Sequence, residues 1–100
     1  MCTLIAYLRK GAPFPLIVAA NRDEMLSRPS TPPQLHGGAP ACIAPRDQVA
    51  GGTWLGLNAH GLFVGVTNRF GVPKDERRSS RGQLVANALK IGSAAALRCV

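Results

Sequence analysis

Two short apolar runs near the start of the chain limit its fold more than any other feature of the sequence. The first extends from Cys2 to Leu8 and the second from Phe14 to Ala20, and both are rich in residues that favour β-strands. The residues between them, 9–13 (RKGAP), are typical of a turn. The pattern therefore predicts an antiparallel β-hairpin at the start of the chain.

Apolar side chains stand at neighbouring positions in both strands, as in Leu4-Ile5 and Ile17-Val18. Because neighbouring strand residues point to opposite faces, we expect both faces of the hairpin to be covered, as in a layered fold. The chain is 46% hydrophobic and 17% charged over 100 residues, which is typical of a folded chain rather than a disordered one. Its length suits one domain, 1–100.

The middle of the chain predicts a loop and further strands. We expect a loop from Arg28 to Pro40, because this stretch holds four prolines and two glycines. A short strand is predicted at Cys42 to Ala44. Strands at Thr53 to Leu57 and Leu62 to Thr67 are predicted to pair across the turn 58–61 (NAHG).

The last fifth of the chain predicts helices. Ser80 and Gln83 match the capping box that opens a helix, which we expect to run to about Lys90, and a second helical segment is predicted from Ala94 to Val100. These elements leave one face of the sheet poorly covered, and the last helix has no stop signal. We therefore predict an α+β fold with antiparallel hairpins and a C-terminal helix, forming the N-terminal portion of a longer domain.

The net charge of +7 would attract anions such as nucleic acid or acidic membrane surfaces. The basic residues are dispersed except in the segment 74–81, where Asp75 and Glu76 dilute them and Phe70 is the nearest aromatic side chain for base stacking. A solvated loop is expected in this segment, and no nucleic-acid binding.

Other features bear on location and cofactors. The longest purely apolar run, Leu16 to Ala20, is five residues, whereas a membrane helix needs about 20. The basic pair Arg9-Lys10 follows the first apolar stretch instead of preceding it, unlike a secretory signal. We therefore expect no transmembrane segment and a cytoplasmic location. Cys2, Cys42 and Cys99 lack metal-type spacing, so reduced thiols and no metal are expected.

Cys2 is the most informative candidate for chemistry. Removal of Met1 would leave this cysteine as the first residue, with both a thiol and a free amine. The thiol has a reference pKa near ~8.5 and the amine one near ~7.7–8.0, so roughly a tenth of the amine is neutral at pH 7 and able to accept the thiol proton. One residue would then supply nucleophile and base. The alternative is that Cys2 is simply an apolar strand residue.

Four polar residues, 21–24 (NRDE), directly follow the second apolar run. If the hairpin forms, this segment returns beside the start of the chain, where Arg22 could stabilise the thiolate of Cys2 and Asp23 could orient its amine. Since neighbouring strand side chains point to opposite faces, both can meet the thiol only at a bulge or turn. A structural salt bridge is the alternative, with Arg28 as another partner for Asp23 or Glu24.

The segment 51–61 holds a further candidate. Asn58 could offer its amide to a developing oxyanion, although asparagine also favours the first position of a turn for structural reasons. Residues 51–54 (GGTW) lack the lysine and helix of a phosphate loop. We expect these glycines to let a strand begin close to other backbone, and Trp54 to lie in the core.

Four short motifs occur in order along nearly the whole chain: Met1-Cys2, NRDExxxRP at 21–29, GGTWLG at 51–56 and SRGxLV at 80–85. Together they resemble the NRDE family, whose eukaryotic members are called transport and Golgi organisation protein 2. That family is similar to the N-terminal nucleophile (Ntn) hydrolases, which have a four-layer αββα fold and cleave amide bonds with a first-residue nucleophile. The resemblance implies a partial αββα fold, with Cys2 as nucleophile and Arg22, Asp23 and Asn58 at positions matching those of cysteine-type acylases.

The resemblance implies a cysteine hydrolase of non-peptide amide (C–N) bonds in a small-molecule substrate. Eukaryotic family members have also been associated with haem trafficking and lipid metabolism, so a non-catalytic carrier of haem or a lipid-like ligand is a second hypothesis. No haem motif surrounds His36 or His60. A third hypothesis is an inactive fragment that lacks residues needed for either activity.

Overall fold

The computed structural model of the chain describes residues 2–68, 71–73 and 75–98. Its first two strands, β1 (Leu4–Leu8) and β2 (Leu16–Ala20), pair antiparallel with Ala6 opposite Val18. Gly11 lies in the turn between them with a φ of +80°, which glycine adopts without strain. The predicted hairpin is confirmed.

A four-stranded antiparallel sheet follows, in the order β3-β4-β5-β6. Its strands are β3 (Ser30–His36), β4 (Cys42–Asp47), β5 (Leu55–Asn58) and β6 (Phe63–Gly65). The strands predicted around the turn 58–61 are confirmed with shorter bounds, and the Gly61 amide donates to the Asn58 carbonyl at 2.9 Å to close that turn. β4 is longer than the predicted strand and continues to Asp47.

The prediction of a loop from Arg28 to Pro40 is wrong, because Ser30–His36 forms a strand at the edge of this sheet. Proline lacks the N–H that a central strand must donate, but an edge strand pairs on one side only. Pro32-Pro33 lies where the register against β4 shifts, between Thr31 and Gln34. The irregular register accommodates the missing donors, so a proline-rich segment still joins the sheet.

Two helices complete the described part of the chain, α1 (Arg81–Ala88) and α2 (Ala94–Leu97). The predicted start of α1 is confirmed, because the Ser80 hydroxyl accepts a hydrogen bond from the Gln83 amide at 3.2 Å. The predicted end of the second helix at Val100 lies outside the described residues. Within the described ranges, neither helix has the length and apolar character needed to cross a bilayer.

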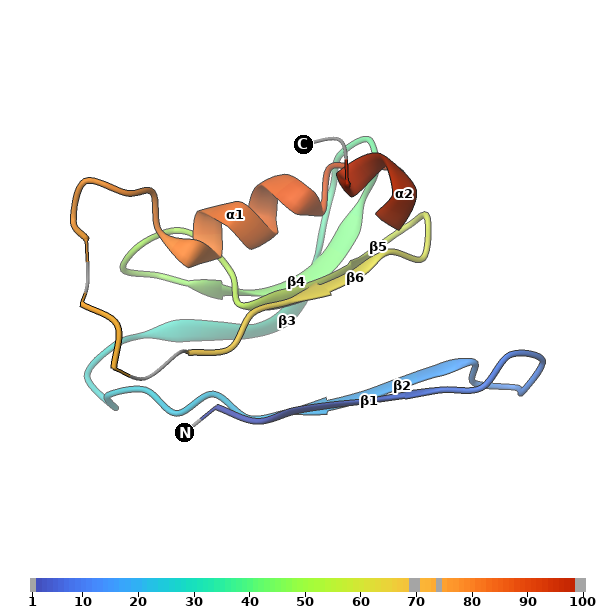
Figure 1. Cartoon of the computed structure of the whole chain (residues 1–100), viewed down its shortest axis with the longest axis horizontal. Coiled ribbons are helices and arrows are strands. Elements are labelled where there is room, and N and C mark those ends of the chain that lie inside the picture. The colour runs from blue at the N-terminus through green and yellow to red at the C-terminus, as the bar shows by residue number, and fades with distance from the viewer. Residues whose placement is uncertain (1, 69–70, 74, 99–100) are drawn as a thin grey trace.

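The elements form three layers, with α1 on one face of the four-stranded sheet and the hairpin on the other (Figure 1). Residues paired across neighbouring strands share a face of the sheet, so Gly56 and its partner Val64 both face α1. Gly65 faces the hairpin, because a Cβ added to it would lie 2.7 Å from Leu4 Cδ1. The buried core between α1 and the sheet consists of Ala44, Val85 and Leu89, with Cys42, Val64 and Val66 packed against it. The α+β layered fold is therefore confirmed.

The hairpin is not covered on both faces by the described residues, contrary to the prediction. Its side chains Ile5, Tyr7, Leu8, Phe14 and Ile17 are each more than half exposed. Only one face of the hairpin contacts the four-stranded sheet, through residues such as Leu4. Apolar strand residues indicate burial in a complete layered fold, which needs a second covering layer that the described residues do not supply.

The connection from β4 to β5 packs backbone against backbone at the start of α1. The Thr53 amide donates to the Gly82 carbonyl at 3.2 Å, and a Cβ on Gly52 would lie only 2.5 Å from the Gly82 carbonyl carbon. The expectation that glycine lets a strand begin close to other backbone is confirmed at Gly52. This contact fixes the start of α1 beside the sheet, where it forms one wall of the cavity described next.

Candidate functional site

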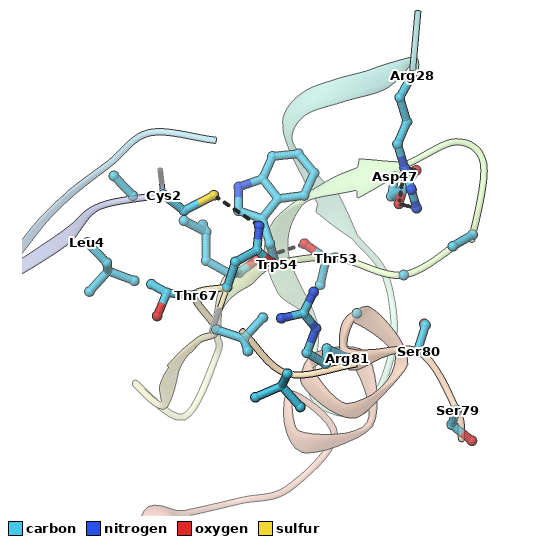
Figure 2. A pocket seen from close by; sticks show the side chains of 18 of the residues that line it. Cys2, Leu4, Arg28, Asp47, Thr53, Trp54, Thr67, Ser79, Ser80 and Arg81 are labelled. Carbon is cyan, nitrogen blue, oxygen red and sulfur yellow. Dashed lines mark hydrogen bonds and ion pairs between the residues drawn. The ribbon is translucent and has the colours of Figure 1, made fainter. Parts of the chain in front are cut away.

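A cavity of about 820 Å³ opens between the start of the hairpin, the sheet and the start of α1 (Figure 2). Each of these elements contributes lining residues, among them Cys2, Trp54, Asn68 and Arg81. The volume lies in the range of small-molecule sites. The first residues of the chain and the first turn of α1 thus face a shared space.

The Cys2 thiol is half-buried and points into this cavity (Figure 2). Its Sγ lies 3.8 Å from Asn68 Nδ2 and 3.9 Å from the backbone carbonyl oxygen of Asp23. The predicted return of the strand end beside the chain start is confirmed, because the Asn21 amide donates to the Thr3 carbonyl at 3.1 Å and the Thr3 amide donates to Asn21 Oδ1 at 2.7 Å. The thiol is therefore held between two strand ends.

Asp23 is the member of the NRDE segment that lies beside Cys2. Asn21 Nδ2 donates a hydrogen bond to Asp23 Oδ1 at 3.1 Å and so fixes this exposed carboxyl beside the strand end. Met1 lies outside the described residues, so its removal stays a prediction, as does the role of Asp23 in orienting the amine.

Arg22 is not among the residues that line the Cys2 cavity. Its guanidinium carbon lies 4.5 Å from the centroid of the Trp54 ring, a cation–π contact, and its Nη2 lies 3.8 Å from Asp47 Oδ2. The side chain of Arg22 and the backbone carbonyl of Asp23 thus contact different parts of the fold. Trp54 is half-buried, and Trp54 and Asp47 both line the cavity, so Arg22 reaches this site through its contacts with these two residues.

Asp47 anchors the cavity wall at the end of β4. Arg28 Nε donates to both of its carboxylate oxygens, at 3.1 and 3.3 Å, and the Val49 amide donates to Oδ1 at 3.0 Å. These hydrogen bonds, led by that from Arg28, lower the pKa of Asp47 to about 2 despite its burial. The ion pair of Arg28 is therefore with Asp47 and not with Asp23, because pairing of β3 with β4 places Ser30 opposite Asp47.

Asn58 is buried away from the thiol and uses all of its amide hydrogen-bonding groups. Its Nδ2 donates to the carbonyls of Leu89 and Ile91 at 3.1 and 2.8 Å, and its Oδ1 accepts from the amides of His60 and Leu62, both at 3.0 Å. It ties the β5–β6 turn to the end of α1 and is not among the residues lining the cavity. The structure thus does not bring this predicted oxyanion donor to Cys2.

Sequence patterns did not single out two polar residues that line the cavity, Asn68 and Arg81. Asn68 comes shortly after β6, as Asn21 comes directly after β2. A polar residue just beyond a strand end is the sequence signal that could have identified Asn68 as a site residue. Arg81 belongs to the basic segment 74–81 and also to the helix predicted to open at Ser80, and the structure places it in the first turn of α1.

No group of three or more His, Cys, Asp or Glu side chains able to hold a metal ion occurs among the residues that the structure describes. His36 Nε2 lies 2.9 Å from the Ala44 carbonyl oxygen. His36 and His60 are both outside the lining of the cavity.

The layers and the cavity define an α+β protein with a cysteine-lined cavity. The chain belongs to the Transport and Golgi organisation 2 family, whose model matches residues 1–97. A curated relative, the Transport and Golgi organization protein 2 homolog of Homo sapiens, is 37% identical over 79 residues, which cover 76% of this chain and 29% of the relative. Relatives from Mus musculus and Bos taurus are 35% and 34% identical over the same coverage. The matched segment thus spans less than a third of these relatives, and no solved structure matches the chain.

Proposed function

We propose that the chain carries the nucleophile of a cysteine amidohydrolase of the N-terminal nucleophile type, acting on a non-peptide amide of a small molecule. The observation that carries the proposal is the Cys2 thiol facing a cavity of ligand size with an amide side chain, Asn68, 3.8 Å away. The proposal requires removal of Met1, so that Cys2 also supplies the amine.

In the proposed reaction the Cys2 amine takes the thiol proton, and the sulfur forms a bond to the carbonyl carbon of the substrate. The tetrahedral intermediate collapses by breaking the C–N bond, and the leaving amine accepts that proton. Water then attacks the thioester and transfers a proton to the departing sulfur as the C–S bond breaks. The products are a carboxylic acid and an amine, and the thiol is restored.

Three polar groups have proposed roles in this reaction. Asp23, whose backbone carbonyl oxygen lies 3.9 Å from the Cys2 sulfur, orients the amine. Asn68, whose Nδ2 lies 3.8 Å from the sulfur, supplies the oxyanion donor that the family resemblance assigns to Asn58. Arg22 supports the site through its contact with Trp54.

Acylation of the thiol tests this function. Intact mass measures whether Met1 is removed, and p-nitrophenyl acetate should acylate Cys2 at least tenfold faster than Cys42, as read by peptide mass spectrometry. Asn68→Ala should slow acylation of Cys2 by about 100-fold, as for the loss of an oxyanion donor. Retention of Met1, or equal rates at the two thiols, would remove the enzyme proposal.

A carrier role is the second candidate, favoured by the apolar part of the cavity lining, which includes Leu4, Val66 and Val72. Titration with haemin, followed by its Soret band, tests this role. Absence of saturation would remove haem as the ligand, and unchanged affinity in a His36→Ala/His60→Ala double variant would remove both histidines as ligands.

We also propose a cytoplasmic location, because a nucleophilic cysteine must stay reduced to act. Cell fractionation followed by immunodetection tests it. Recovery of the protein in a secretory compartment would contradict the proposal.

A further inference from the structure

The charged side chains that line the cavity are unequally matched. Arg28 pairs with Asp47, and Arg78 Nε lies 3.6 Å from Asp75 Oδ2. Among the described residues, no carboxylate lies within ion-pair distance of Arg81. The described lining therefore carries one guanidinium in excess of its acids.

Arg81 is exposed, and its position at the start of a helix makes its charge mildly unfavourable. It is the first residue of α1, whose first turn holds no acidic residue, and a cation at a helix N-terminus interacts unfavourably with the helix dipole. In Figure 2 its guanidinium extends from the start of α1 into the cavity, toward Thr53. A ligand anion would offset the charge at this point.

We propose that Arg81 binds a carboxylate of the substrate, so that the cavity selects amides whose carbon skeleton carries a negative charge. This inference rests on the proposed function of Cys2. The planar guanidinium donates two parallel hydrogen bonds to a carboxylate, which fixes the substrate's orientation relative to the thiol across the cavity.

The observations favour a carboxylate over a nucleic-acid or phosphate ligand. One guanidinium of the described lining has no acidic partner, and its single positive charge would be balanced by one carboxylate. A phosphate monoester carries nearly two negative charges at pH 7. The cavity is also walled by the hairpin, sheet and helix, which suits a small molecule rather than a polymer backbone.

Alkylation of Cys2 by two reagents of similar size tests the proposal. Iodoacetate carries a carboxylate and iodoacetamide is neutral, so the ratio of their rate constants at Cys2, measured by peptide mass spectrometry, reports on anion binding in the cavity. Arg81→Gln should lower this ratio about fivefold, the effect of one charge at partly screened distance. Arg81→Lys should restore part of it, because a point charge lacks the planar fork.

Arg9→Gln is the matched control, because Arg9 follows β1 at the end of the hairpin remote from Cys2 (Figure 1) and is absent from the cavity lining. This variant removes the same net charge and should leave the ratio unchanged. An equal fall in Arg9→Gln and Arg81→Gln, or no fall in Arg81→Gln, would overturn the proposal.

The two reagents also keep this proposal separate from the nucleophile proposal. If iodoacetamide modifies Cys2 no faster than Cys42, the thiol is not activated and the proposed function fails, whatever the ratio. If iodoacetamide reacts selectively with Cys2 but the ratio of rate constants is unchanged in Arg81→Gln, only the carboxylate proposal fails. Inorganic phosphate should protect Cys2 from iodoacetate no better than acetate does at equal ionic strength, and stronger protection by phosphate would overturn the choice of a carboxylate.

Discussion

Replacement of Asn58 by alanine distinguishes an anchoring role of this side chain from a catalytic one. The change removes four hydrogen bonds, of which that to the Leu89 carbonyl is buried and those to the Ile91 carbonyl and the His60 and Leu62 amides are partly buried. An unsatisfied buried group costs roughly 1–3 kcal/mol, and each bond that water can replace contributes less, about 0.5 kcal/mol. The expected loss in the free energy of unfolding is therefore about 3 kcal/mol.

The loss should be visible in thermal unfolding followed by circular dichroism. For a domain of this size, about 3 kcal/mol corresponds to a fall in Tm of roughly 15 °C. Asn87→Ala is the matched control, because Asn87 is exposed on α1 and, within the described part of the chain, its side chain accepts a hydrogen bond only from Gln83. The control should change stability by less than about 0.5 kcal/mol.

The opposite outcome would assign Asn58 to the chemistry. If Asn58→Ala retains the stability of the unmodified chain but loses acylation of Cys2, the amide is an oxyanion donor and the anchoring argument fails. If both stability and acylation are lost, the residual acylation measured at a temperature where the variant is folded separates the two effects.

Three further changes have expected outcomes. The pKa of Asp47 is lowered from 3.8 to about 2, so its contribution of about 2 kcal/mol is present above pH 4 and is lost as the pH falls toward 2, and Asp47→Asn should flatten the Tm profile over that range. Gly52→Ala would place a Cβ 2.5 Å from the backbone of Gly82 and should cost about 3 kcal/mol in urea unfolding, whereas Gly37→Ala, with open space around it, should cost less than about 1 kcal/mol. Arg81→Gln should raise stability by about 0.3–1 kcal/mol at low salt, and a fall in Tm would contradict the argument that its charge opposes the helix dipole.

Features set by near neighbours in the sequence were predictable, and those set by distant packing were not. The hairpin, the turn that begins at Asn58 and the cap at Ser80 depend on contacts a few residues apart, and sequence patterns predicted all three. The strand at Ser30–His36 escaped prediction because its place at a sheet edge is a tertiary property, which proline content does not indicate.

The same distinction applies to the candidate site. The return of Asn21 beside the chain start followed from hairpin pairing alone. The side chain of Asn58 binds the end of α1 at Leu89, 31 residues away in the sequence. No local sequence pattern indicates a contact between residues so far apart. The neighbour of the Cys2 thiol, Asn68, is 66 residues away and required the sheet to be placed against the hairpin.

The NRDE segment acts as a positional anchor for the thiol, because its residues bind different parts of the fold. Asn21 joins the backbone at the start of β1 at 2.7 Å, and the Asp23 carbonyl oxygen lies 3.9 Å from the Cys2 sulfur. Arg22, between them, stacks on Trp54 on the other side of the segment. Consecutive polar residues of this segment therefore bind different parts of the fold, the start of β1, the surroundings of the thiol and the Trp54 ring, and together they fix the segment beside Cys2.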